Sequence, residues 1–148
     1  MVSGVRRFPD TENGGLLLGI KKENKIFIVE AIEAGIDSVR EKGRLSFEGS
    51  SMEHTVTSII DLYEEELSII GIWHKHGHDH NPPFSAEDEM CHKALSNQLK
   101  HEIITILFQK KLNDEYVMRV FCYKNEKLSE EEFGISALEK MIHYKSYI

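Results

Sequence analysis

Short hydrophobic runs alternate with polar turns along most of the chain, and their spacing predicts a mixture of strands and helices. The apolar run at 16–20 and the β-branched run at 25–32 flank a polar turn at 21–24, a pattern typical of a β-hairpin. Asn-Gly-Gly at 13–15 predicts a turn before this hairpin. Residues 33–50 are rich in glycine and charge, which predicts a long loop with one short strand near 45–47.

The rest of the chain adds two helices and three strands. A helix is predicted near 51–65 from apolar residues at helical spacing, which are Val56, Ile59, Ile60 and Tyr63. The mostly apolar run at 67–73 predicts a buried strand. Ser85 opens a second helix at 85–99, and its predicted inner face consists of Met90, Ala94, Leu95 and Leu99. Strands are predicted at 103–108 and 116–123.

The order of these elements is strand, strand, helix, strand, helix, strand, strand, without a repeat or a linker. This order predicts the α/β (α+β) class, with a single mixed β-sheet flanked by helices in one domain over residues 1–148. The tail at 127–148 is not assigned to an element, although its part at 137–144 is compatible with a helix.

Charge and composition exclude several classes of protein. The chain has 148 residues, and 18 Lys+Arg against 25 Asp+Glu give a net charge of -7, which argues against nucleic acid as a partner. The longest apolar runs are far shorter than the ~18 residues of a membrane span, so no membrane partner is expected. No secretory signal is expected at the N-terminus, and two cysteines fit reduced thiols, so the predicted location is cytoplasmic.

A metal site is predicted directly after the strand at 67–73. Four of the eight histidines fall within residues 74–80, and His74 and His76 stand two residues apart at the end of the strand, so their side chains point the same way. Asp88, on the first turn of the next helix, can supply a third ligand. Three such ligands with an open fourth position are typical of catalytic zinc. Glu12, beside the glycines at 14–15, is placed to be the base that such a site needs.

Three motifs in this order resemble the JAB/MPN family of JAMM metalloproteases. The first is Glu-Asn-Gly-Gly-Leu-Leu-Leu-Gly at 12–19, the second Gly-Ile-Trp-His-Lys-His at 71–76, and the third Ser-Ala-Glu-Asp at 85–88. The Trp before the first His is similar to the prokaryotic branch of the family. The resemblance covers roughly residues 12–123 and implies a JAB/MPN fold of the cytidine deaminase-like type.

The resemblance also implies an activity. His74, His76 and Asp88 would bind Zn²⁺, Glu12 would act as general base and then acid, and Ser85 would hydrogen-bond the developing oxyanion. Family members cut the peptide or isopeptide bond after the C-terminus of a ubiquitin-like or sulfur-carrier protein. Some of them act together with activating and conjugating enzymes.

The sequence departs from the family pattern in four places. Lys75 stands where Ser or Thr is commonest, and Gly77 stands where Pro usually follows. One extra residue separates His76 from Ser85, which opens a rival ligand set of His76, His78 and Asp88. The N-terminal strand and helix of the family are expected to be missing or shortened, because few residues precede Glu12.

Other interpretations of the same residues remain open. Ser85 and Asp88 also match a plain helix N-cap with an acidic residue at its third position. The chain could be a non-catalytic MPN scaffold, or a domain that binds metal through a flexible tract at 74–80. Two further predictions concern single side chains: Cys91 is expected to be a buried structural thiol, and His92 a surface histidine.

Overall fold

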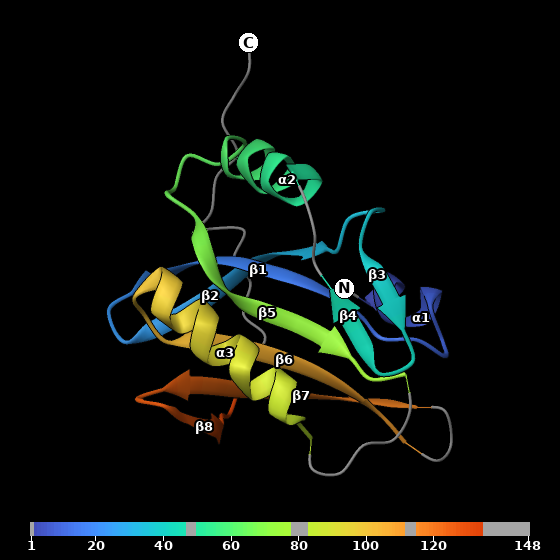
Figure 1. Cartoon of the computed structure of the whole chain (residues 1–148). Coiled ribbons are helices and arrows are strands. Elements are labelled where there is room, and N and C mark those ends of the chain that lie inside the picture. Colours follow the sequence, from blue (N-terminus) through green and yellow to red (C-terminus); the bar gives the residue numbers. More distant parts are fainter. Residues whose placement is uncertain (1, 47–49, 78–82, 112–114, 135–148) are drawn as a thin grey trace.

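The computed structural model describes residues 2–46, 50–77, 83–111 and 115–134, and it contains one mixed β-sheet with helices on both faces (Figure 1). The elements in chain order are α1 (Val2–Arg7), β1 (Asn13–Lys22), β2 (Lys25–Glu33), β3 (Val39–Glu41), β4 (Arg44–Ser46), α2 (Ser50–Ile60), β5 (Ser68–Lys75), α3 (Ala86–Leu99), β6 (Ile103–Lys110), β7 (Tyr116–Lys124) and β8 (Lys127–Glu130). This mixed α+β architecture confirms the fold class predicted from the sequence.

The six-stranded sheet has the order β2-β1-β5-β6-β7-β8, and β3 and β4 pair separately. Only β5 and β6 are parallel, because α3 carries the chain back between them. The other neighbours in the sheet are antiparallel, and the predicted hairpin is β1 with β2. The end of β5 therefore lies in the middle of the sheet, next to the start of β1.

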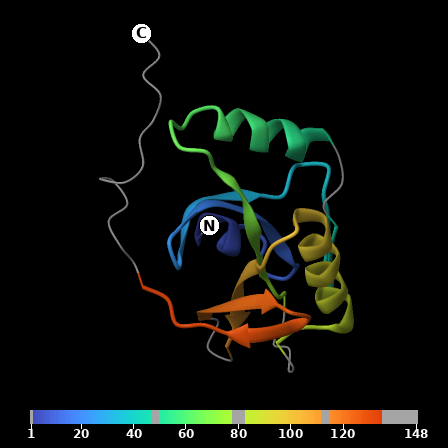
Figure 2. The same ribbon diagram turned by 90° about the vertical axis from the view of Figure 1, so that its left-hand side faces the viewer.

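Alternation along the strands separates two buried layers. Leu18 packs beneath α2 with Met52 and Val56, whereas Leu17 points to the other face and packs with Val5 of α1. α2 and α3 therefore cover one face of the sheet, and α1 lies on the other (Figure 2). No helix among the described residues is long and apolar enough to cross a membrane.

The predicted turn at 13–15 is wrong, because these residues are the first three of strand β1. Their glycines serve close packing instead of a turn. A Cβ on Gly15 would lie 1.7 Å from the carbonyl oxygen of Ile32, and one on Gly14 would lie 2.4 Å from that of Trp73. Strand β1 can approach β2 and β5 this closely only because residues 14 and 15 have no side chains.

Two further assignments differ from the prediction, and a third is not tested. The helix predicted near 51–65 ends at Ile60, because a turn follows that buries Tyr63 in the core beneath α2. The long loop at 33–50 contains two short strands, β3 and β4, of which β4 corresponds to the strand expected near 45–47. The helix suggested at 137–144 lies outside the described residues.

The inner face predicted for the second helix is wrong for two of its four residues, whereas Leu95 and Leu99 are half-buried. Met90 is 71% exposed and Ala94 is exposed, whereas His92 is completely buried. Among the side chains described in α3, His92 is the buried one, so this helix is attached to the sheet through a polar residue rather than an apolar stripe. The spacing of apolar residues could not predict this buried face of α3, because its completely buried residue, His92, is polar.

Candidate metal centre

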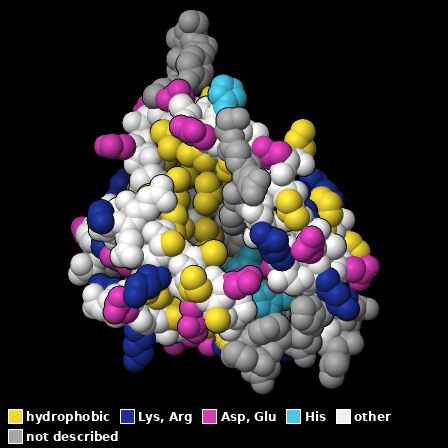
Figure 3. Space-filling view, in the orientation of Figure 1, with side chains coloured by type: hydrophobic (Ala, Val, Ile, Leu, Met, Phe, Trp, Pro, Cys, Tyr) yellow, Lys and Arg dark blue, Asp and Glu magenta, His cyan; other side chains and the backbone are white. Residues whose placement is uncertain are grey.

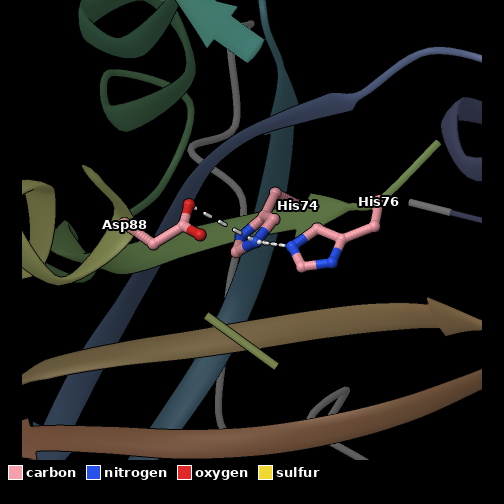
Figure 4. Close-up of side chains that lie close together, drawn as sticks. All are labelled: His74, His76 and Asp88. Atoms are coloured by element: carbon pink, nitrogen blue, oxygen red, sulfur yellow. Dashed lines mark hydrogen bonds and ion pairs between the residues drawn. The ribbon is translucent and has the colours of Figure 1, made fainter. Parts of the chain in front are cut away.

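His74, His76 and Asp88 come together at the end of β5, as Figure 4 shows. Their nearest ligand atoms all lie within 4.8 Å of one another. The Nε2 atoms of the two histidines are 3.0 Å apart, and Asp88 Oδ1 lies 3.9 Å from His74 Nε2. Both histidines are buried, and the carboxylate reaches them from the first turn of α3.

Ser85 holds the Asp88 carboxylate in place. Its backbone N–H and its hydroxyl both donate to Asp88 Oδ2, at 2.7 and 2.8 Å. The Asp88 N–H also lies 3.2 Å from the Ser85 hydroxyl, which completes a capping box at the start of α3. One carboxylate oxygen is thus used by the cap, and the other faces the histidines. The N-cap interpretation and the metal interpretation are both compatible with this geometry.

The electrostatics of the site favour metal-binding forms of the side chains. Burial lowers the pKa of His74 to about 3, which leaves its imidazole neutral with a free lone pair. Burial acts to raise the pKa of the Asp88 carboxyl, yet this pKa lies below its usual value because His74 and the hydrogen bonds from Ser85 stabilise the anion. Two imidazoles and a carboxylate form a donor set that suits zinc.

The centre opens onto a cleft of ≈ 320 Å³. One wall comes from the β3–β4 hairpin and the other from the start of α3; the lining residues are Glu12, Gly43, Arg44, Leu45, Ser46, Ile72, Trp73, His74, Ser85, Glu87, Asp88 and Cys91. In Figure 3, hydrophobic side chains gather beneath α2, and histidine side chains are visible near the centre of the same face. The lining thus combines apolar side chains such as Leu45 and Ile72 with the polar His74, Ser85 and Asp88.

Glu12 directly precedes β1, and the register of that strand brings it toward the candidate metal ligands. Asn13 pairs with Lys75 and Gly14 pairs with His74, so one further step along both antiparallel strands brings Glu12 opposite His76. Because side chains on a strand alternate, this continued register puts Glu12 on the face of the two histidines, and Glu12 lines the same cleft as His74. Its backbone N–H donates to the Glu41 carbonyl at 2.8 Å, which ties it to β3.

Two side chains near the centre were not expected from the sequence. His92 lies one helical turn after Asp88, is completely buried, and approaches the Thr105 hydroxyl at 2.6 Å between the rings of Phe84 and Tyr123. The prediction of a surface histidine is wrong, because α3 packs this side of its axis on the sheet. A buried histidine could have been suspected only from the scarcity of apolar residues on α3.

The prediction that Cys91 is buried is also wrong, since this thiol is exposed and lines the cleft. Partial burial, together with the charges of Asp88 and Glu87, raises its pKa, so it is a poor nucleophile. The structure thus brings together Glu12, His74, His76, Ser85 and Asp88 of the predicted residues. His78, which belongs to the rival ligand set, lies outside the described residues.

Comparisons with known proteins agree with this fold. The profile of the family described as prokaryotic homologs of the JAB domain matches residues 1–125. The solution structure of protein DSY2949 from Desulfitobacterium hafniense is similar in fold, with a TM-score of 0.59 at 18% sequence identity. That match covers 89% of this chain and 83% of the other. No curated protein matches the chain in sequence.

Proposed function

The chain belongs to the family of prokaryotic homologs of the JAB domain, and from this premise we propose that it is a zinc-dependent peptidase or isopeptidase. The proposed substrate is the bond that follows the C-terminus of a ubiquitin-like or sulfur-carrier protein. The observation that carries the proposal is the convergence of two buried histidines and one carboxylate in a cleft that also contains Glu12.

His74, His76 and Asp88 would hold the metal. Neutral imidazole and ionised carboxylate are the forms that bind metal, and both are favoured at neutral pH for His74 and Asp88. Zinc at such a site supplies an acidified water and a Lewis acid for the scissile carbonyl. Iron or nickel could occupy the same ligands during expression, because the donor set does not select strictly for zinc.

Glu12 would move the proton. In the proposed reaction its carboxylate accepts a proton from the attacking water and delivers it to the leaving amine, which typically contributes ~10²–10⁴ in rate. Its location on the face of the histidines, at the edge of the cleft, supports this role. The carbonyl of Glu41 in β3 accepts a hydrogen bond from the Glu12 N–H, which holds the backbone from which this side chain extends.

Ser85 would have a double role. Its single hydroxyl hydrogen is donated to Asp88, so the structure supports a role in orienting that ligand. Its predicted role as a donor to the oxyanion requires the hydroxyl to turn away from Asp88 during the reaction. We therefore expect the loss of this hydroxyl to weaken the metal site as well as to slow the reaction.

Turnover of a matched substrate tests the proposal. The probe is a ubiquitin-like protein that ends in glycine, encoded beside this chain, fused through that glycine to a fluorescent reporter. Metal-replete protein should release the reporter, and Glu12→Gln should bind one zinc per chain but release the reporter at least about a hundredfold more slowly. Wild-type-like turnover by Glu12→Gln would sink the proposed mechanism. No cleavage by a metal-replete wild type would favour a non-catalytic scaffold.

A further inference from the structure

Lys75 stands between His74 and His76 in the sequence. Its side chain points to the face of the sheet opposite to that of the two histidines. It is completely buried, although lysine is almost never so without a partner. Its Nζ donates to the carbonyl oxygen of Phe8 and lies 3.5 Å from the Tyr116 hydroxyl, 5.6 Å from the centre of that ring. The strand that carries the metal ligands is thereby bonded to the segment at 8–11, which leads into Glu12.

Gly77 touches the same segment from the other side of His76. A Cβ at this position would lie 2.7 Å from the carbonyl oxygen of Asp10 and 3.0 Å from the carbonyl carbon of Thr11. These neighbours are backbone atoms, so any side chain at 77 would have to displace the segment itself. Lys75 and Gly77 thus act on one stretch of backbone, the first by a hydrogen bond and the second by leaving room.

The segment is also held where it enters β1. The Glu12 N–H donates to Glu41, and the buried Asn13 side chain donates to the Gly4 carbonyl at 2.9 Å. Arg40 donates to the Asn13 side-chain oxygen at 2.9 Å, and its guanidinium lies 4.8 Å from the centre of the Phe8 ring. The contact of Lys75 with Phe8 therefore secures the outer end of a segment whose inner end is already fixed.

We propose that Lys75 and Gly77 are positioning residues for Glu12: together they hold the backbone of residues 8–11 against the end of β5. Lys75 and Gly77 are also two of the departures from the family pattern, and both of them contact the segment at 8–11. The inference rests on the proposed function only for the importance of Glu12 to catalysis. The positioning itself is a statement about backbone mobility and is measurable without a substrate.

Hydrogen exchange at the Glu12 amide reports on this positioning directly, because that amide is hydrogen-bonded to Glu41. Lys75→Met keeps most of the length of the side chain but removes the donor, and Gly77→Ala adds the Cβ that the segment has no room for. In both variants we expect the Glu12 amide to exchange roughly tenfold faster, while the amides of α3 are unchanged. Zinc content should remain one per chain, because the ligands are untouched.

Lys93→Met is the matched control, since Lys93 lies on the surface of α3 and pairs with the exposed Glu126. It should leave exchange at Glu12 as in the wild type. Unchanged exchange at Glu12 in both test variants would overturn the inference, as would equal acceleration across the whole sheet, which indicates general destabilisation. If Lys75→Met does not fold, Gly77→Ala decides alone by the same criteria.

Turnover of the reporter fusion adds a second measurement once cleavage is established. Lys75→Met should lower kcat and leave KM unchanged. When it is combined with Glu12→Gln, kcat should fall no further than in Glu12→Gln alone, because Lys75 acts through Glu12. Additive losses in the double variant would contradict the inference. If the wild type cleaves nothing, the proposed function fails, whereas the exchange measurement still decides whether Lys75 and Gly77 position the segment.

Discussion

Replacing Ser85 with alanine perturbs the helix cap and the candidate metal ligand Asp88 together, because one hydroxyl serves both. The substitution removes the hydroxyl that donates to Asp88 Oδ2 at 2.8 Å and that accepts from the Asp88 N–H at 3.2 Å. The Ser85 backbone N–H still donates to the same oxygen at 2.7 Å. The carboxylate therefore keeps one of its two hydrogen bonds from Ser85 and remains near the histidines, but it is held less firmly.

Both losses can be estimated from typical values. Loss of an N-cap side chain costs ~1 kcal/mol. Loss of a hydrogen bond to a charged group costs ~1.5–3 kcal/mol, with the lower end expected here because the Asp88 side chain is 25% exposed. The two terms share one hydroxyl and are not additive, so we expect a loss of about 2 kcal/mol in the free energy of unfolding of the metal-free protein, close to 1 M in the urea midpoint.

Zinc affinity should fall about 10–100-fold in the same variant, which is typical for the loss of a group that orients a ligand. The assay is competition for zinc against a chelator of known affinity, with urea unfolding in parallel. At saturating zinc the stoichiometry should still be one per chain. Ser85→Thr keeps a capping hydroxyl and should restore most of both quantities. A wild-type urea midpoint together with wild-type zinc affinity in Ser85→Ala would refute the reasoning.

Three further predictions concern the surroundings of the centre. Gly15→Ala should unfold the protein at room temperature or lower its melting temperature by more than about 10 °C, because the new Cβ meets the Ile32 carbonyl at 1.7 Å; a circular dichroism melt like the wild type would contradict this. His92→Ala should lower the free energy of unfolding, measured with urea, by about 3 kcal/mol, because it leaves a cavity and an unpaired Thr105 hydroxyl. A change below about 1 kcal/mol would show that other contacts attach α3 to the sheet. Metal-free protein should lose stability as the pH falls below 6.5, by up to ~1.4 kcal/mol per pH unit, because His74 binds a proton in the unfolded chain but stays neutral in the folded one down to a pKa of about 3. Urea midpoints at pH 7 and pH 5 test the last prediction, and equal midpoints would contradict it.

The strands and the convergence of His74, His76 and Asp88 could be predicted because each depends on local spacing. The period of two along β5 places His74 and His76 on one face, and a capping residue marks the start of α3, so Asp88 follows at a fixed distance. Glu12 is a candidate base from its place beside the glycines at 14–15 and from the resemblance of its motif, but its approach to the histidines depends on strand pairing, and pairing partners cannot be derived from one strand alone.

The remaining features depend on contacts between distant segments. The glycines at 14–15 have the local signature of a turn, yet tertiary packing against Ile32 and Trp73 makes them part of a strand. His92 is polar, so an apolar pattern at helical spacing does not reveal it, although it is completely buried. The hydrogen bond between Lys75 and Phe8 joins residues 67 positions apart, which no local pattern encodes.

Zinc content after dialysis against a weak chelator tests whether His74, His76 and Asp88 hold the metal. We expect one tightly bound zinc per chain in the wild type, none in His74→Ala, and one in His78→Ala, which serves as the matched control and tests the rival ligand set. The variants differ from each other only in which histidine of the tract at 74–80 is removed. One tightly bound zinc in His74→Ala, or its loss in His78→Ala alone, would contradict the assignment of the metal centre to His74, His76 and Asp88.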